Sequence, residues 1–136
     1  MKVKLHRLGW TSELEEFVKR MNLSEPFDYT ASFIFTGKID GELAFVNVFR
    51  LESVGDKVIP RFIHILLDKP VRRSKLAIDL MKQSEEYLKI LGYTQVFAYI
   101  SNEDRLMSTL AMKFGYVKNK EDKRSTYYFK NLTKEK

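Results

Sequence analysis

Three cationic side chains stand where an amphipathic segment begins in the middle of the chain. They are Arg72, Arg73 and Lys75, near the start of the stretch from Lys69 to Tyr93. A helix N-terminus carries about half a positive charge and normally attracts acidic side chains. Two interpretations are therefore open. The cations either point into water and pair with nearby acids such as Asp68, or they hold an anion together with free N–H groups of the helix start.

The place of this cationic turn favours the anion site. The turn joins the C-terminal end of a predicted buried strand, residues 58–67, to the helix that follows. In open α/β sheets, ligands collect beside the C-terminal ends of the strands. We therefore expect a diphosphate on the backbone amides from about residue 72 to residue 77, with the three cations neutralising its charge.

Hydrophobic periodicity and turn residues predict the element order β-α-β-β-β-α-β-α-β-β. Strands are expected at residues 2–9, 30–38, 43–51, 58–67, 94–100, 116–120 and 125–131. Helices are expected from Ser12, from the cationic turn to Gly92, and from a cap at Ser101 or Asn102 to Gly115. The strand–helix–strand unit around the central helix makes a parallel crossover, so the fold class is a mixed α/β domain. We expect a single domain over residues 1–136, because no linker or repeat interrupts the chain.

Local signals within these elements predict turns, burial and caps. The pair Asp40-Gly41 predicts a hairpin between two of the strands. The run at residues 43–51 is apolar on both faces, which is typical of an inner strand. Ser12 and Glu15 have the spacing of a capping box. The last helix is expected to bury Leu106, Leu110 and Phe114, with Met107 and Ala111 beside them.

Composition limits the classes of function. The chain has 44% hydrophobic and 31% charged residues, as in soluble globular proteins, and no apolar run of about 20 residues that could span a bilayer. It has no Cys and two His, His6 and His64, far apart in sequence, so we expect no metal site. The net charge of +6 indicates anionic partners, but no nucleic-acid-binding motif is present and nucleic acid is not an expected partner. We expect a cytoplasmic monomer or homodimer.

The order of elements resembles the GNAT superfamily of N-acetyltransferases. The acetyl-CoA motif of that family, R/Q-x-x-G-x-G/A, falls on the residues from Arg72 to Ala77, where Arg72 and Ala77 match and Lys75 replaces the middle glycine. The stretch LAMKFGYV at residues 110–117 is similar to the end of the family's fourth helix. Ala111 stands where many members carry a Tyr that protonates the departing thiolate.

The resemblance implies a central mixed sheet with splayed parallel strands, flanked by helices, and an acyl-CoA site. The pantetheine arm would pair with the strand that ends in Ile65-Leu66-Leu67, and Asn102 would contact it. The pyrophosphate would lie on the amides from Arg73 to Ala77, and the thioester would enter the gap between the splayed strands. The implied cofactor-binding residues are Ile65, Leu66, Leu67, Arg72, Arg73, Ser74, Lys75, Leu76, Ala77 and Asn102.

Acetyl transfer to an amine requires a base, a hydrogen-bond donor to the thioester oxygen, and an acid for the thiolate. A backbone N–H near Leu66 is the implied donor. His64 is the candidate catalytic base, because it is the titratable residue near the strand end whose ordinary pKa is close to neutral. The alternative is a structural His in the core. Weaker candidates for the base are Glu42, Glu52 and Tyr99, and for the acid Ser108, Tyr116 or water.

Two functions remain as hypotheses from different classes. The first is an N-acetyltransferase that uses acetyl-CoA and a small-molecule or protein amine as acceptor. The alternative is a catalytically inactive binding or structural module with the same fold, contacting nucleic acid through its basic surface. Lys75 and Ala111, which depart from the family pattern, favour the alternative, whereas the charge and placement of the helix start favour the enzyme.

Overall fold

The computed structural model describes residues 4–6, 11–21, 33–69, 71–72 and 75–132 of the 136-residue chain. Its element order is the predicted one. In chain order the elements are β1 (Lys4–His6), α1 (Ser12–Met21), β2 (Phe33–Ile39), β3 (Glu42–Val54), β4 (Lys57–Leu67), α2 (Lys75–Ile90), β5 (Gln95–Ser101), α3 (Arg105–Lys113), β6 (Val117–Glu121) and β7 (Ser125–Asn131). Arg73 and Ser74, two of the predicted phosphate-turn residues, lie outside the described residues.

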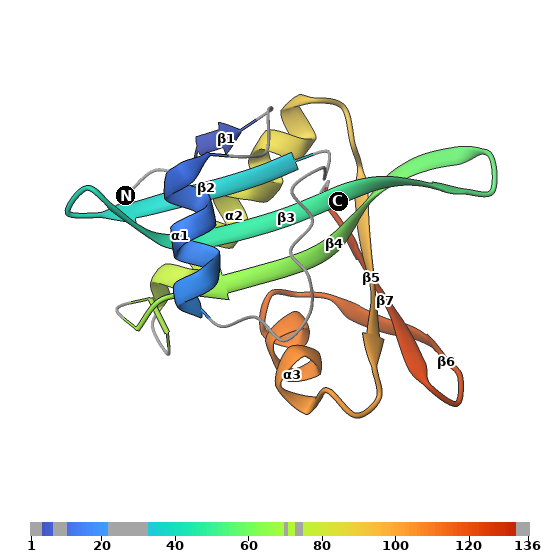
Figure 1. The fold of residues 1–136 in the computed structure, drawn as a ribbon. Helices are drawn as coiled ribbons and strands as arrows, with labels where there is room; N and C mark the ends of the chain where they lie inside the picture. The colour runs from blue at the N-terminus through green and yellow to red at the C-terminus, as the bar shows by residue number, and fades with distance from the viewer. Residues whose placement is uncertain (1–3, 7–10, 22–32, 70, 73–74, 133–136) are drawn as a thin grey trace.

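The strands form one seven-stranded mixed sheet in the order β1-β2-β3-β4-β5-β7-β6 (Figure 1). The pairing of β4 with β5 is parallel and the other pairings are antiparallel. The predicted mixed α/β fold class is confirmed. β3 lies between β2 and β4, as its two apolar faces predict.

The hairpin between β2 and β3 turns at Asp40 and Gly41, as predicted. Both residues have positive φ, 52° and 83°, and Ile39 pairs with Glu42 on either side of them. A two-residue turn with both central residues in this region matches the right-handed twist of the flanking strands. This local chemistry sets the register of β2 on β3.

Helices cover both faces of the sheet, with α1 in front of it and α2 behind it in Figure 1. α1 buries Leu14 and Phe17 against Ile34 and Val48, which lie on the front face. α2 buries Leu80 and Leu88 against a second cluster on the back face that includes Phe35 and Phe49. Ala111 and Phe114 belong to the same cluster as α2, so α3 packs on the back face as well.

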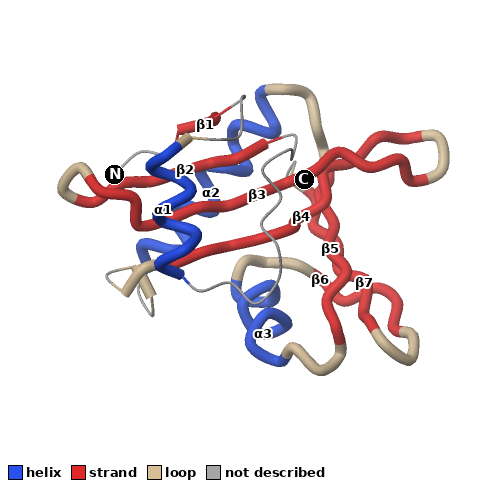
Figure 2. The backbone as a smooth tube through the Cα atoms, viewed as in Figure 1, coloured by secondary structure: helices blue, strands red, loops and turns tan. Residues whose placement is uncertain are grey.

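β4 and β5 separate from each other, which confirms the splayed parallel strands. Both strands are described throughout, and the single residue pair between them is Arg61 with Phe97. Beyond that pair, β4 and β5 run in clearly different directions (Figure 1). Figure 2 shows β5, β6 and β7 turning away from the plane of β2, β3 and β4. Among the residues that the structure describes, the backbone of β4 after Arg61 therefore has no strand partner on the β5 side.

A β-bulge in β4 lies close to this divergence. Val48 of β3 pairs with His64 and the next residue, Phe49, pairs with Phe62, so Ile63 is an extra residue in β4. Such a bulge places two residues of one strand opposite one residue of its partner and bends the strand. It also changes which face of the sheet the later residues of β4 occupy.

The capping residues of two helices differ from the prediction. The cap of α1 is Thr11, whose Oγ1 accepts a hydrogen bond from Leu14 N at 3.1 Å, and not Ser12. The cap of α3 is Asp104, whose carboxylate accepts from Met107 N at 3.0 Å, and not Ser101 or Asn102. Leu106, in the first turn of α3, is 72% exposed, so its predicted burial is wrong.

Candidate functional site

The end of β4 and the start of α2 form a tight turn with several backbone donors. Asp68 N bonds to Ala44 O at 2.9 Å, and Asp68 O accepts from Val71 N at 2.9 Å and from Arg72 N at 3.2 Å. Val71 is completely buried and anchors the turn in the core. α2 then begins at Lys75, with no acidic residue in its first turn. The N–H groups of a first helical turn have no partner four residues earlier in the helix, and helix starts of this kind bind anions in many proteins.

The acid of this turn, Asp68, pairs with a cation from another element. Its carboxylate bonds to Arg20 of α1 at 2.6 Å and accepts from Lys69 N at 2.8 Å. The hydrogen bond from Arg20, helped by that from Lys69, lowers the pKa of Asp68 below its ordinary value. Asp68 is therefore already neutralised by α1 and is not a counter-ion reserved for the basic turn.

Arg72 is held by a backbone oxygen. Its Nε donates to Leu67 O at 2.8 Å, and within the described parts of the chain no acidic side chain is paired with it. Lys75 is exposed at the first position of α2. Asp68 makes its ion pair with Arg20, although the charge of Arg72 also contributes to the low pKa of Asp68. The interpretation in which the cations of the turn serve only to pair with Asp68 is therefore weakened.

Two other predicted residues of the turn can act only through their backbones. Ala77 is 6% exposed and its side chain packs in the back-face cluster. Leu76 is half-buried and packs against the same cluster. Their N–H groups, with that of Lys75, make up the start of α2. A phosphate placed there would contact backbone and not these side chains.

The end of β4 presents backbone to the gap beside it. Ile65 and Leu67 pack against the back-face cluster, while Leu66 is buried in the front-face cluster. Within the described residues β4 pairs with β5 only at Arg61, so the backbone of Ile65 and Leu67 on the β5 side has no strand partner there, and Leu67 O accepts from Arg72 Nε instead. The backbone of Leu66 faces Val46 of β3. An extended chain of amides, such as a pantetheine arm, fits this edge.

His64 lies on the front face of the sheet, whereas α2 packs on the back face. It is 6% exposed and stands in one cross-strand row with Val48 and Ile34, which pack against α1. Regular alternation from Phe62 would have put His64 on the back face, but the bulge at Ile63 moves it to the front. The structure thus brings His64 near the β4 edge but separates its side chain from α2 and α3.

Asn102 is occupied by the loop that follows β5. Its Nδ2 donates to Asp122 O at 2.9 Å, and its Oδ1 accepts from Thr126 Oγ1 at 2.6 Å. Its backbone N also bonds to Arg124 O at 2.8 Å. The side chain therefore connects the end of β5 to the β6–β7 hairpin, and contact with a pantetheine arm stays a prediction.

Glu52 is a poor candidate for the base. Its carboxylate accepts from Arg50 at 2.9 Å and from Arg61 at 3.1 Å. Burial works to raise the pKa of Glu52, but these hydrogen bonds outweigh it and the pKa lies below its ordinary value. Arg61 also stacks over the exposed ring of Tyr99, 5.6 Å from its centroid. A carboxylate held by two guanidinium groups takes up a proton less readily than a free one.

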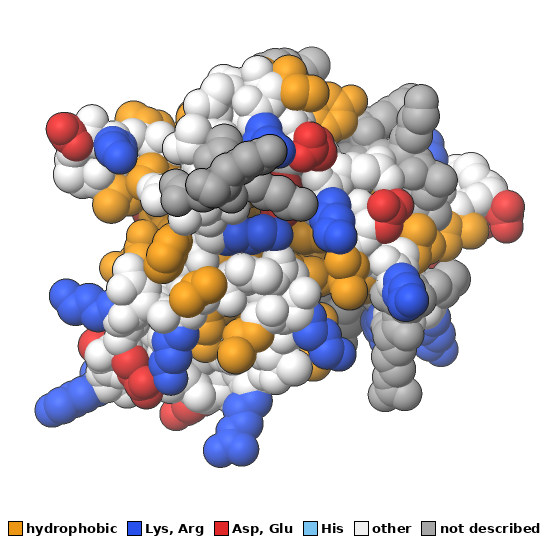
Figure 3. Space-filling view, turned by 180° about the vertical axis from the view of Figure 1, so that it is seen from behind, with side chains coloured by type: hydrophobic (Ala, Val, Ile, Leu, Met, Phe, Trp, Pro, Cys, Tyr) orange, Lys and Arg blue, Asp and Glu red, His pale blue; other side chains and the backbone are white. Residues whose placement is uncertain are grey.

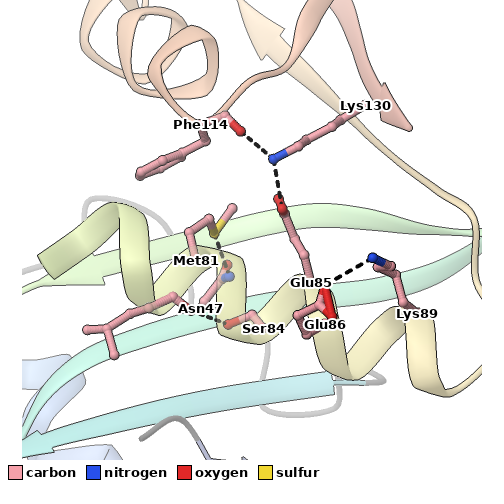
Figure 4. A network of polar contacts seen from close by, with 9 residues as sticks. Asn47, Met81, Ser84, Glu85, Glu86, Lys89, Phe114 and Lys130 are labelled. Carbon is pink, nitrogen blue, oxygen red and sulfur yellow. Dashed lines mark hydrogen bonds and ion pairs between the residues drawn. The ribbon is translucent and has the colours of Figure 1, made fainter. Parts of the chain in front are cut away.

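A cavity of about 260 Å³ opens between α2 and α3, on the back face of the molecule. Figure 3 shows this face, from which several Lys and Arg side chains project. Across the cavity wall, Lys130 Nζ of β7 bonds to Glu85 Oε1 of α2 at 2.7 Å and to Phe114 O at 2.6 Å (Figure 4). The cavity is lined by Ile78, Met81, Lys82, Glu85, Lys113, Phe114, Gly115 and Lys130.

Sequence reasoning missed Glu85 and Lys130. Glu85 has a signal in the sequence, because it follows Met81 by four residues and precedes Leu88 by three, on the buried face of α2. Burial raises the pKa of Glu85, although the hydrogen bond from Lys130 opposes the shift. Lys130 has no such signal, since its partners are 45 and 16 residues away in sequence.

Two absences apply to the parts of the chain that the structure describes. Among those residues, no group of three or more His, Cys, Asp or Glu side chains could hold a metal ion. Nor is any helix within them long and apolar enough to cross a membrane.

The structure is similar to solved acetyltransferases. A Bacillus subtilis acetyltransferase in complex with CoA has a TM-score of 0.73 and 15% identity, covering 97% of this chain and 99% of that one. An N-acetyltransferase from Staphylococcus aureus Mu50 has a TM-score of 0.74 and 10% identity, with 97% and 99% covered. An acetyltransferase of the GNAT family from Streptococcus pneumoniae has a TM-score of 0.69 and 12% identity, with 97% and 100% covered. No family model and no curated protein matches the sequence. At such identities the likeness shows a shared fold.

Proposed function

We propose that this chain, which has the GNAT fold, transfers an acetyl group from acetyl-CoA to the amine of a small molecule or protein. The observation that carries the proposal is the separation of β4 from β5 beyond Arg61 and Phe97, beside a basic helix start that has no acid in its first turn. The gap accepts an extended chain, and the helix start accepts a diphosphate.

The residues present fit the cofactor in charge and in backbone geometry. The backbone of Ile65 and Leu67, which faces the β5 side of β4, would bind the amides of the pantetheine arm, with Arg72 beside Leu67 O. The backbone of Leu66 faces Val46 of β3 and would contribute through its position between them. The N–H groups at the start of α2 would hold the pyrophosphate, with Arg72 and Lys75 adding positive charge. Lys75 at the glycine position does not block this arrangement, because it lies within the helix and its backbone N–H remains a donor. When bound, acetyl-CoA supplies the activated thioester.

The remaining chemistry falls to residues on the front face. If the cofactor lies along α2 and α3 on the back face, an amine can approach the gap from the α1 side. His64 lies on that side and is the candidate base that takes the proton of the amine. Glu52 is less suited, because Arg50 and Arg61 stabilise its charged form.

Calorimetric titration with CoA tests the proposal. We expect binding that weakens about tenfold or more in the double variant Arg72→Ala/Lys75→Ala, since each loses a charge-assisted contact with phosphate. The matched control is Lys89→Ala/Lys118→Ala, which removes two cations that pair with acids elsewhere, at Glu86 and Glu121. Equal affinity in both double variants, or no binding by the wild type, contradicts the proposal.

Turnover is tested separately with a thiol-release assay over a panel of amines. His64→Ala should lower turnover more than CoA affinity if His64 acts as the base. Equal turnover in variant and wild type removes His64 from that role.

A second candidate function is a non-catalytic module with this fold. The observation that favours it is Ala111, which is fully buried and leaves no phenol at the position where the resembling family carries its acid. Absence of CoA binding together with salt-dependent DNA binding would support this alternative.

A further inference from the structure

Lys130 is a preorganised ammonium group at the wall of the cavity between α2 and α3. Its side chain is 21% exposed and that of its partner Glu85 is 7% exposed. A lysine ammonium has three N–H donors. Two are used, toward Glu85 Oε1 and Phe114 O, and the third has no partner among the residues that the structure describes (Figure 4).

The backbone around Lys130 is shaped to admit it. Gly115 has a φ of +93°, and a Cβ built there would lie 3.2 Å from Lys130 Cε and 3.3 Å from Lys130 Nζ. The missing side chain therefore leaves the path of the lysine open. Lys130 reaches Phe114 O, a carbonyl at the C-terminus of α3, where the helix dipole favours a cation.

Two contacts show which residues of β4 lie next to this cavity. Met81, which lines it, accepts a hydrogen bond at Sδ from Asn47 Nδ2 at 2.8 Å, and Asn47 pairs with Ile65 of β4. Tyr116, next to the lining residue Gly115, has its ring 6.0 Å from that of Phe62. The cavity therefore lies beside residues 62–65 of β4, where the bulge occurs and β5 diverges, and Lys130 itself pairs with Val96, the residue before Phe97 at the β4–β5 pair.

The charge of the cavity suits a developing anion. Its lining contains three lysines and a single acid, Glu85. A group that becomes negative during a reaction is stabilised by cations already fixed around it. In the proposed function the thioester enters the gap between β4 and β5 beside this cavity. The group that becomes negative there is the departing sulfur.

We propose that Lys130 is a catalytic residue that receives the leaving thiolate of acyl-CoA; this rests on the proposed function. As the amine nitrogen bonds to the carbonyl carbon, the carbon–sulfur bond breaks and the sulfur keeps the electron pair. Lys130 donates its third N–H to the sulfur as a hydrogen bond, and its positive charge stabilises the thiolate. The thiolate takes a proton from water in the cavity, which yields the CoA thiol, and the proton lost by the amine leaves through the base on the front face and replaces it in the solvent.

The charged groups around Lys130 also influence the stability of a thiolate in the cavity. Lys82 and Lys113 add positive charge from α2 and α3, and Glu85 opposes a thiolate. Burial, and then the charge of Glu85, raise the pKa of Tyr116 well above its ordinary value, so its phenol stays neutral. Removing Lys130 and removing the charge of Glu85 should therefore have opposite effects on a bound thiolate.

The test is the pKa of the CoA thiol when bound, read from the ultraviolet absorbance of the thiolate during a pH titration. We expect it to lie below that of free CoA in the wild type and to rise by about one unit or more, a tenfold effect, in Lys130→Met. Glu85→Gln should shift it the other way, and Lys130→Arg should keep it low because the charge remains. Lys89→Met, which removes a cation of α2 outside the cavity, should leave it unchanged.

Desulfo-CoA, which lacks the sulfur, should bind wild type and Lys130→Met equally. The proposal is overturned if Lys130→Met shifts the thiol pKa no more than Lys89→Met, or if Glu85→Gln shifts it in the same direction as Lys130→Met. If Lys130→Met does not fold, the sign of the Glu85→Gln shift decides. Failure of the wild type to bind either CoA or desulfo-CoA would instead refute the proposed function itself.

Discussion

Glu85 is an acid on the buried face of α2, and the ion pair with Lys130 offsets the free-energy cost of burying its carboxylate. A buried charge is tolerated when it is paired and hydrogen-bonded, and breaking such a pair from one side costs more than the pair contributes. Glu85 Oε2 is buried and has no partner among the described residues, and the same holds for the hydroxyl of Tyr116. Buried polar atoms of this kind are uncommon in proteins, and that of Glu85 belongs to a residue that lines the cavity between α2 and α3.

The backbone at Gly115 offers a direct test of how closely Lys130 is fitted. We expect Gly115→Ala to lower the free energy of unfolding by about 2 kcal/mol, because a positive φ costs an alanine about 1–2 kcal/mol and Lys130 must also move. The measurement is urea unfolding. The control is Gly55→Ala, which has a φ of +65° and open space around a Cβ, so it bears the backbone cost alone. An equal loss in both variants would contradict the close fit of Lys130.

Single functional residues could be predicted from the sequence where the residue type is unusual for its position in a helix. Residues whose role depends on partners distant in sequence could not. Arg72 and Lys75 stood out because bases rarely open a helix, and Glu85 could have been found as an acid on an apolar face. Asn102 and Lys130 could not, because Asp122, Thr126 and Glu85 reach them from 20 to 45 residues away. His64 was placed near the correct strand end, but its face depends on a bulge that periodicity does not show.

The elements followed from local chemistry wherever one signal dominated. Asp40-Gly41 set the β2–β3 turn, and the apolar positions of α2 set its buried face. The start of α3 was misplaced because Ser101, Asn102 and Asp104 are all residues that cap helices well. Asn102 is engaged by the β6–β7 hairpin, which leaves the cap to Asp104.

The cap of α3 can be tested by substitution. Asp104→Ala should lower the free energy of unfolding by about 1 kcal/mol, because Met107 N loses its acceptor at the end of a nine-residue helix. Chemical denaturation measures the loss. Glu103→Ala removes a neighbouring acid that does not cap the helix and should change stability by less than half as much. If the two variants lose the same amount, Asp104 does not act as the cap.

At the scale of the whole molecule, the main feature is the divergence of β4 from β5 within the single sheet. β4 pairs with β3 along its length and with β5 at one point, so in the described part of the chain its C-terminal end has no strand neighbour on the β5 side, and helices lie on both faces. The element order was predictable from periodicity. The separation of the two parallel strands was not, because a missing set of hydrogen bonds leaves no mark in the pattern of either strand; the resemblance to GNAT proteins implied it.

Amide hydrogen exchange with and without CoA tests the central claim most directly, since it locates the ligand without requiring the acceptor. We predict that CoA slows exchange at residues 65–67 of β4 and at residues 75–77 of α2, because the proposed cofactor would lie against the backbone of both segments. The β3–β4 hairpin tip around Gly55 should not change, and serves as the internal reference. CoA binding that protects other segments and leaves both of these unchanged would contradict the account.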